Sequence, residues 1–428
     1  MLRRLWSPLW LVVVLVTAAC SGSGADGDDG DGTAGTKKLD GQTVEVLSPW
    51  TGQDQERFAA VLDRFSERTG ADVVSTSAPP DELGARLDGL LETGDAPAVA
   101  VLPRVGLLGE LAGRGILKPL PKTAADLVDS HYDAVWRELA TANSELYGVW
   151  FKADNKSTLW FNAAALDGAG VKAPTTWEEL QAAAGALAAA GIAPIAVGAA
   201  DGRRVSDWFE NVYLRTAGTI AYIDLARHQL AWDDVTVVAA LRTLAEVFRP
   251  EWVAGGATGA VATDAATAAA GVFAGPPTAG FVLDADPGMT GEQAGVVEFP
   301  TIGDSPSSVV VSGDVAVLLD DSPAGEALVE FLATPEAGGI WAALGGFTSP
   351  NKDVDPSTYA SDNERRVAGA LHGAEAVRYD MSELQPLAFG ADPDQGLWPL
   401  FQQYLGEPAA ATEVADLMEK IANGIFEP

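Results

Sequence analysis

QTVEVLSPWTGQDQERFAAVLDRFSERTGADVVST, residues 42–76, contains a strand pattern, a helix pattern and a second strand pattern in succession. Val44 and Val46 recur with a period of two, which predicts a strand that ends near Trp50. The next segment is predicted to be an amphipathic helix that closes on Gly70. Its apolar positions are Phe58, Val61, Leu62 and Phe65. ADVVST then predicts a second short strand.

The alternation of helix and strand continues along the chain. PDELGARLDGLLETGDAP (80–97) has the spacing of an amphipathic helix, and AVAVLP (98–103) has the composition of a strand. VGLLGELAGRGILKPL (105–120) follows as a helix that is stopped by Gly115. Strands and helices in this order are typical of a parallel sheet covered by helices.

A second unit of the same kind follows. Thr176 and Glu179, three residues apart, form a capping box that begins an Ala-rich helix. IAPIAVG (192–198) is predicted to be a buried strand, and residues 207–214 have a helical apolar face.

Two late segments, 296–302 and 307–319, also have strand composition and could return to the first unit. The predicted fold class is therefore α/β, with two lobes joined by several crossings. A ligand is expected in the cleft between the lobes, where binding sites commonly lie.

The N-terminus has the features of an export signal. Arg3 and Arg4 precede an apolar run, residues 9–16, that is too short to cross a bilayer as a stable helix. The run leads to Thr17-Ala18-Ala19-Cys20, which resembles the lipobox of a bacterial lipoprotein and predicts lipidation of Cys20. An ordinary secretory signal, with Cys20 as a spare thiol, is the alternative. The Gly-, Ser- and Asp-rich tract after Cys20 is predicted to be a flexible tether.

Composition excludes several kinds of partner. The formal net charge of −33 argues against binding nucleic acid or an anionic ligand by long-range attraction, and is explained equally well by solubility. Cys20 is the only cysteine, so an internal disulfide is excluded. His131, His228 and His372 are far apart in sequence, with no ligand spacing typical of zinc, so neither a metal site nor a cofactor is expected.

YGVWFKADNKSTLWFN, residues 147–162, collects large rings and charges in one segment. A sugar ring has apolar C–H faces and a rim of hydroxyl groups, so its site needs flat aromatic platforms with polar partners at the edges. The candidate platforms are Trp150, Phe151 and Trp160, and the candidate edge partners are Asp154, Asn155 and Lys156. Similar sets occur at SDWFEN (206–211) and near Trp50, Thr51 and Asp54. The alternative for the tryptophans is burial in the core, and the alternative for Asp154 and Lys156 is a strand edge that faces solvent.

Catalysis is the competing hypothesis. Glu178 with Glu179, or Asp207 with Glu210, could form the carboxylate pair of a glycosidase. Glu179 already has a role in the capping box, and the sequence contains no nucleophile elbow, P-loop or dinucleotide fingerprint. The protein is therefore expected not to be an enzyme, with a lipid-anchored glycoside hydrolase as the alternative.

Several segments together resemble a known family, extracellular solute-binding proteins, family 1. These are the sugar-binding lipoproteins of bacterial ABC importers, and the likeness is to the maltose-binding-protein-like binders of alpha-glucosides and oligosaccharides. The matching segments are PWTGQDQERFAAVLDRFSERTG, DAPAVAVLPRVGLLGELAGRGILKPL, ELYGVWFKADNKSTLWFN, PTTWEEL, DWFENVYL, ATPEAGGIWAALGGFTSPNK, YDMSELQPLAFG and GLWPLF. The sequence departs from the family at PPTAGFVLD, near Pro276, where relatives often carry an aromatic residue.

The resemblance implies a type II periplasmic-binding-protein fold with a carbohydrate held between the lobes. The implied ligand-binding residues, together with the platform Trp160, are Trp50, Thr51, Asp54, Asp154, Lys156, Trp208, Asn211 and Phe347. The expected segments are a signal peptide at 1–19, a tether at 20–39, an N-terminal lobe from 40–152 and 281–338, and a C-terminal lobe from 153–280 and 339–428.

The resemblance also implies partners and a location. The protein is expected to be a monomer on the outer face of the cytoplasmic membrane, anchored through lipidated Cys20, and to deliver its sugar to ABC permease subunits. No nucleic-acid partner is expected. A solute-binding protein of the same architecture with a non-sugar ligand is the other alternative.

Overall fold

The computed structural model describes residues 38–273, 279–285, 293–392 and 394–426. The predicted signal peptide, Cys20 and most of the tether lie outside the described residues, as does Pro276. Among the described helices, none is long and apolar enough to cross a membrane.

The first sheet is built on the predicted βαβ segment. Its strands are β1 (Thr43–Ser48), β2 (Asp72–Ser77), β3 (Val99–Leu102), β6 (Gly148–Asn155), β11 (Ser308–Leu318) and β12 (Ala376–Tyr379). The order is β12-β11-β3-β1-β2, and β6 pairs with β11. β1 runs parallel to β2 and β3, whereas β11 runs antiparallel to both β3 and β6. The sheet is therefore mixed rather than purely parallel, because the late strand β11 enters it in the opposite direction.

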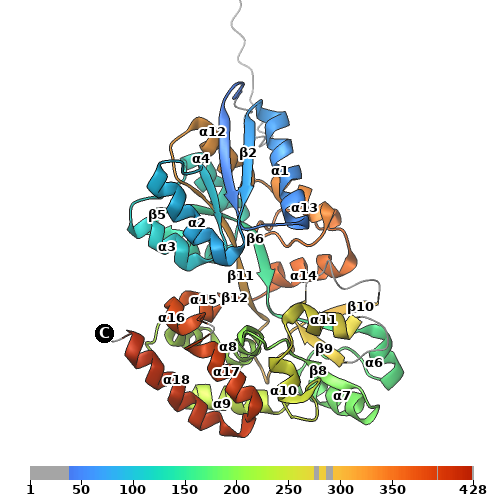
Figure 1. Ribbon diagram of the computed structural model, residues 1–428. Coiled ribbons are helices and arrows are strands. Elements are labelled where there is room, and N and C mark those ends of the chain that lie inside the picture. Colours follow the sequence, from blue (N-terminus) through green and yellow to red (C-terminus); the bar gives the residue numbers. More distant parts are fainter. Residues whose placement is uncertain (1–37, 274–278, 286–292, 393, 427–428) are drawn as a thin grey trace, which may run out of the picture. The chain divides into compact units, whose positions relative to one another are not determined.

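Helices with one apolar face cover this sheet (Figure 1). They are α1 (Gln53–Thr69), α2 (Pro80–Thr93), α3 (Val105–Gly113), α4 (Lys122–His131), α5 (Ala134–Leu139), α12 (Pro323–Leu332) and α13 (Pro335–Leu344). The helix α1 buries the four predicted apolar residues and ends at Gly70, whose φ of 78° is the left-handed conformation that glycine adopts without strain. The short strands β4 (Thr141–Ala142) and β5 (Glu145–Leu146) form a hairpin before β6. This sheet and its helices are the first lobe.

The second lobe has its own sheet and its own hydrophobic core. Its strands are β7 (Thr158–Asn162), β8 (Ala193–Ala196), β9 (Ala279–Leu283) and β10 (Ala294–Glu298), in the order β10-β7-β9-β8. Its helices are α6 (Ala163–Ala169), α7 (Trp177–Ala189), α8 (Arg203–Ala226), α9 (Val235–Ala245), α10 (Gly256–Val261), α11 (Ala265–Phe273), α15 (Met381–Leu384), α16 (Leu387–Gly390), α17 (Leu397–Gly406) and α18 (Ala411–Phe426). The capping box of Thr176 and Glu179 is confirmed at the start of α7.

Within the described residues, the chain crosses between the two lobes at three places. Residues 156–157 join β6 to β7, residues 299–307 join β10 to β11, and residue 380 joins β12 to α15. Hydrogen bonds tie the first crossing to β11: the Lys156 amide donates to the Val310 carbonyl, and the Val310 amide donates to the Ser157 hydroxyl at 2.8 Å. The predicted two-lobed α/β fold with several crossings is confirmed.

The segment after α13 bridges the two lobes. The short helix η2 (Pro356–Thr358) packs on α13, and α14 (Asp362–Gly373) packs on both η2 and β10. Trp341 and Phe347 lie in the first hydrophobic core, although the expected lobe boundary at 338/339 assigned them to the C-terminal lobe. The boundary stays a prediction, and this packing favours a later division.

Candidate functional site

A cavity of about 370 Å³ lies between the two lobes, where the crossings meet. Both lobes contribute to its walls, so a ligand inside it would contact both. The lining residues are Pro49, Trp50, Pro80, Pro103, Lys152, Ala153, Asp154, Asn155, Lys156, Thr158, Trp160, Arg203, Arg204, Asp284, Ala285, Ser312, Gly313, Asp314, Gly346, Phe347, Thr348, Val367 and Glu383. We call this cavity the interlobe pocket.

Trp50 and Asp314 form one wall of the interlobe pocket. Trp50 follows β1, and its indole Nε1 donates a 2.9 Å hydrogen bond to Oδ2 of Asp314 in β11. Burial and the nearby Asp154 carboxylate raise the pKa of Asp314 to about 7, although the Lys152 ammonium opposes the shift. The Asp314 carboxyl group that accepts the indole hydrogen bond therefore gains or loses its proton near neutral pH.

Lys152 extends this wall. Its Nζ lies 2.8 Å from Oδ2 of Asp54 and 5.3 Å from the ring centre of Trp341. Burial alone would lower the pKa of Lys152, but the Asp154 and Asp54 carboxylates outweigh burial and raise it. The ammonium therefore stays charged, and Asp54 compensates the charge without being among the residues that line the pocket.

Aromatic rings stand behind the same wall. Phe347 stacks on Trp341 with ring centres 5.2 Å apart, and Trp50 meets Trp341 edge to face at 4.8 Å. Phe151 joins them at 5.5 Å from Phe347. These rings pack mainly against one another, so Trp50 and Phe347 are only 5% and 2% exposed although both line the pocket.

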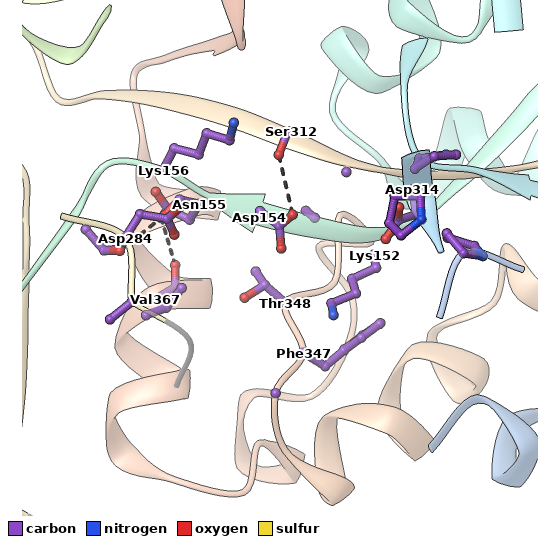
Figure 2. Close-up of a pocket in the computed structure, with 18 of the residues that line it drawn as sticks. Lys152, Asp154, Asn155, Lys156, Asp284, Ser312, Asp314, Phe347, Thr348 and Val367 are labelled. Carbon is purple, nitrogen blue, oxygen red and sulfur yellow. Dashed lines mark hydrogen bonds between the residues drawn. The ribbon is translucent and has the colours of Figure 1, made fainter. Parts of the chain in front are cut away.

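The strand β6 supplies the polar groups at the centre of the pocket. Asp154 is exposed, and the Ser312 hydroxyl on the neighbouring β11 lies 3.4 Å from its Oδ2. Figure 2 shows Asp154, Lys152 and Thr348 around the same space. The Asn155 amide instead donates to the Val367 carbonyl at 3.1 Å, which fastens α14 to this strand. Asp154 is thus a carboxylate free to accept hydrogen bonds from ligand hydroxyl groups.

Lys156 occupies the first crossing and is buried. Its Nζ forms an ion pair with Asp380, and lies 3.5 Å from Oδ1 of Asp207 and 3.7 Å from Oε1 of Glu383. Burial alone would lower the pKa of Lys156, but these carboxylates raise it well above its ordinary value. One cation therefore links the crossing after β6 to α8 and to the crossing before α15.

Arg204 closes the pocket on the second lobe. Its guanidinium forms an ion pair with Asp284 after β9, and its Nη1 donates to Oδ2 of Asp207 at 2.9 Å. Burial raises the pKa of Asp207, although Lys156 and Arg204 oppose that effect. Each buried charge on this side has an opposite charge in contact, which suits an uncharged ligand better than an ion.

Five of the predicted ligand-binding residues come together around the interlobe pocket. They are Trp50, Asp154, Lys156, Trp160 and Phe347. Trp160 is fully buried, and its Nε1 donates to the Thr158 hydroxyl at 3.0 Å. Thr51, Asp54, Trp208 and Asn211 are not among the described residues that line this pocket.

The Trp208 and Asn211 side chains are buried and contact other parts of the protein. Trp208 is fully buried and contacts Phe248 and Phe299 edge to face in the second core. The Asn211 amide nitrogen donates to the carbonyls of Lys156 and Asp207, and its oxygen accepts from the Ser157 hydroxyl at 2.5 Å. Their ligand contacts stay predictions, and α8 buries residues 205–215 against neighbouring elements.

The sequence prediction missed several pocket residues. Asp314 interrupts an apolar strand, and that interruption could have identified it. Arg203 and Arg204 lie two and three residues before the SDWFEN segment, and Asp284 follows β9. Glu383 lies in the YDMSELQPLAFG segment and carried no comparable signal. Burial raises the pKa of Glu383 to about 7 against the opposing charge of Lys156.

The carboxylate pairs considered for glycosidase chemistry have structural partners. The Glu210 carboxylate accepts from the Tyr222 hydroxyl at 2.6 Å and from the Met381 amide at 2.8 Å. Glu179 accepts from the Thr175 amide at 2.8 Å, which lowers its pKa. Within the described ranges, no three His, Cys, Asp or Glu side chains converge in a way that could hold a metal ion.

Two relatives match this chain over most of its length. The chain is 30% identical over 427 residues to the osmoprotective compounds-binding protein GgtB of Synechocystis sp., which covers 96% of this chain and 97% of the relative. It is also 30% identical over 404 residues to the alpha-glucosides-binding periplasmic protein AglE of Rhizobium meliloti, covering 89% and 87% of the two chains.

Solved structures share the fold at lower sequence identity. The bacterial solute receptor AcbH superposes with a TM-score of 0.75 at 17% identity, and the match covers 90% of this chain and 98% of that one. The family model of the bacterial extracellular solute-binding proteins matches residues 50–339. From the family match and the full-length relatives together, the chain belongs to the bacterial extracellular solute-binding proteins.

Proposed function

We propose that the protein captures an uncharged sugar or short oligosaccharide outside the cytoplasm and delivers it to the permease of an ABC importer. The main observation is the interlobe pocket, which is lined by the aromatic side chains of Trp50 and Phe347 and by the exposed carboxylate of Asp154. A sugar needs apolar surface for its C–H groups and acceptors for its hydroxyl groups. The family's extracellular location and solute-binding role agree with this assignment.

The relatives support the ligand class. AglE is named for alpha-glucosides, and AcbH is described with a preference for b-D-galactopyranose. The paired charges around Arg204 and Lys156 favour a neutral ligand, since an ionic ligand would have to displace an existing partner. Binding would stabilise the arrangement in which both lobes touch the sugar, so that a permease can distinguish loaded from empty protein.

The family is one of binding proteins, so the sugar is expected to leave unchanged. The proposal includes lipidation of Cys20, which would hold the monomer at the outer face of the cytoplasmic membrane. An osmoprotective compound is the second candidate ligand, because GgtB carries that name and matches nearly the whole chain.

A thermal-shift screen tests the ligand class. The chain without its first 20 residues would be heated with methyl α-glucoside, maltose, maltotriose, galactose and the non-sugar osmoprotectant glycine betaine. A ligand that binds only the folded state adds about 2.7 kcal/mol to the free energy of unfolding at 100 times its Kd, and so raises Tm. A rise with a sugar supports the proposal. A rise with glycine betaine alone favours the second candidate, and recovery of shortened sugars would favour a hydrolase.

A further inference from the structure

The loop that follows α13 brings three residues to the interlobe pocket. Gly346, Phe347 and Thr348 line the pocket, and we call residues 345–348 the pocket loop. Gly345 and Gly346 have φ angles of 81° and 66°, in the left-handed region that glycine adopts without strain. Glycine is also the most flexible residue, so contacts from outside the loop are needed to hold this path.

Glu364 supplies one such contact from the first turn of α14. The residue is 4% exposed, and its Oε1 accepts a 2.6 Å hydrogen bond from the Gly346 amide. Its Oε2 accepts from the Ser361 hydroxyl at 3.1 Å, which fixes the direction of the carboxylate. A hydrogen bond to a carboxylate is shorter and roughly twice as strong as one between neutral groups. Glu364 itself is not among the described residues that line the pocket.

Arg57 of α1 supplies a second contact with the same glycine. A methyl group on the Gly346 Cα would collide with Nη1 of Arg57, so the guanidinium lies directly against the loop. Nη1 also donates to Oδ1 of Asp54 at 2.8 Å, and the other oxygen of Asp54 accepts from the Lys152 ammonium at 2.8 Å. Arg57 therefore joins the pocket loop to the wall that carries Lys152, and it too is absent from the described lining of the pocket.

The helix that carries Glu364 is fastened to both lobes. The Asn363 amide nitrogen donates to the Ala294 carbonyl of β10 at 2.8 Å, which ties α14 to the second lobe. The Asn155 amide nitrogen of β6 donates to the Val367 carbonyl at 3.1 Å, which ties α14 to the first sheet. The Glu364 carboxylate therefore extends from a helix that hydrogen bonds hold on both sides of the pocket.

We propose that Glu364 and Arg57 are positioning residues for ligand binding. They hold Gly346 between them without touching the ligand, so that Phe347 and Thr348 keep their places in the pocket wall before a sugar arrives. The inference rests on the proposed function and goes beyond it, because it assigns part of the affinity to two residues outside the pocket. Groups that are held in place before binding lose less conformational entropy when the ligand binds, and so raise the affinity.

The first experiment measures hydrogen exchange of the ligand-free protein by mass spectrometry. Glu364→Ala removes the acceptor of the Gly346 amide, so exchange in peptides that contain the pocket loop should be about tenfold faster. Glu364→Gln keeps an acceptor oxygen and should exchange within about twofold of wild type.

Glu336→Ala is the matched control. Glu336 of α13 is also a carboxylate that joins neighbouring helices, and its described partners, Arg64 and Arg68, both lie on α1. Its loss should lower Tm but leave unchanged both the exchange of the pocket loop and the affinity for sugar.

Calorimetric titration with the sugar that raises Tm in the thermal-shift screen gives the second readout, at a temperature at which every variant is folded. Glu364→Ala should bind about tenfold more weakly, Arg57→Met about fivefold more weakly, and Glu364→Gln within about twofold of wild type. Exchange in Glu364→Ala at the wild-type rate, or equal losses of affinity for Glu364→Ala and Glu364→Gln, would overturn the positioning role. If wild-type protein binds no sugar, the proposed function fails, and the exchange rates still decide whether Glu364 holds the loop.

Discussion

The Trp50 indole and the Asp314 carboxylate are joined by a 2.9 Å hydrogen bond across 264 positions of sequence. Trp50 follows the end of β1, whereas Asp314 belongs to β11, which comes after the strands of the second sheet in the sequence. Both line the interlobe pocket. The orientation of the pocket's indole therefore depends on a contact that forms when the late strand returns to the first sheet.

Trp50→Phe should weaken sugar binding about fivefold to tenfold. The substitution keeps an aromatic ring but removes the N–H group that bonds to Asp314, at a cost of about 1 kcal/mol. Calorimetric titration with the sugar identified by the thermal-shift screen measures the change. Trp208→Phe is the control: Trp208 is fully buried in the second core, so its loss should lower Tm and leave the affinity unchanged. Equal affinities for Trp50→Phe and wild type would remove the indole hydrogen bond from the binding mechanism.

Asp314→Asn should change how stability depends on pH. The ordinary pKa of 3.8 is raised to about 7 in the folded protein, so the folded state keeps a proton that the unfolded chain loses as pH rises between these values. The contribution of Asp314 to the free energy of unfolding therefore falls across this window and is constant above it. The stability of Asp314→Asn relative to wild type should rise by about 3 kcal/mol from pH 4.5 to pH 8.

Urea unfolding at pH 4.5, 6, 7 and 8 measures this difference. Asp355 is the control, because hydrogen bonds from the Ser357 amide and hydroxyl lower its pKa. Its contribution is complete above its ordinary pKa of 3.8 and is lost only as pH falls below that value, so the stability of Asp355→Asn relative to wild type should stay nearly constant from pH 4.5 to pH 8. A difference between Asp314→Asn and wild type that does not vary with pH would show that Asp314 titrates normally.

Lys156→Met should destabilise the protein by about 3–5 kcal/mol. The substitution leaves Asp207, Asp380 and Glu383 close together and buried without their shared cation. Urea unfolding measures the loss. Adding Asp380→Asn should recover part of it, because one of the uncompensated charges is removed.

Lys122→Met provides the comparison for an exposed lysine. The Lys122 side chain is 85% exposed and pairs with Asp126 on the same helix, so its loss should cost less than about 1 kcal/mol. Similar costs for the two lysine substitutions would mean that the buried cluster contributes no more than a surface ion pair.

Cys20→Ser should release the protein from the membrane. If Cys20 is lipidated, its acyl chains, such as palmitate, hold the protein at the bilayer surface, and serine cannot replace the thiol. Membrane fractionation and palmitate labelling in a bacterial host measure the change, with Ser23→Ala as the control in the same tract. An unlipidated chain that fractionates as Cys20→Ser does would instead support the ordinary secretory signal.

The local elements could be predicted because neighbouring residues carry the information. The period of Val44 and Val46, the apolar face of α1 and the capping box of Thr176 all depend on residues within a few positions of one another. The same information placed an aromatic and charged segment at β6 and β7, and much of that segment lines the pocket. The direction of β11 could not be predicted in this way, because strand pairing depends on distant segments.

The amino-acid sequence alone determined the alternation of strands and helices, the two α/β units and the residue types of the site, since each follows from local spacing and side-chain chemistry. Only the tertiary structure decided which of those residues face the pocket. Trp208 and Asp154 both lie in segments that the sequence predicted to bind ligand. Packing around α8 buries Trp208, whereas the position of Asp154 in β6 leaves its side chain exposed. The reason is physical: burial of a side chain is set by the elements that pack around it, and most of those come from distant parts of the chain.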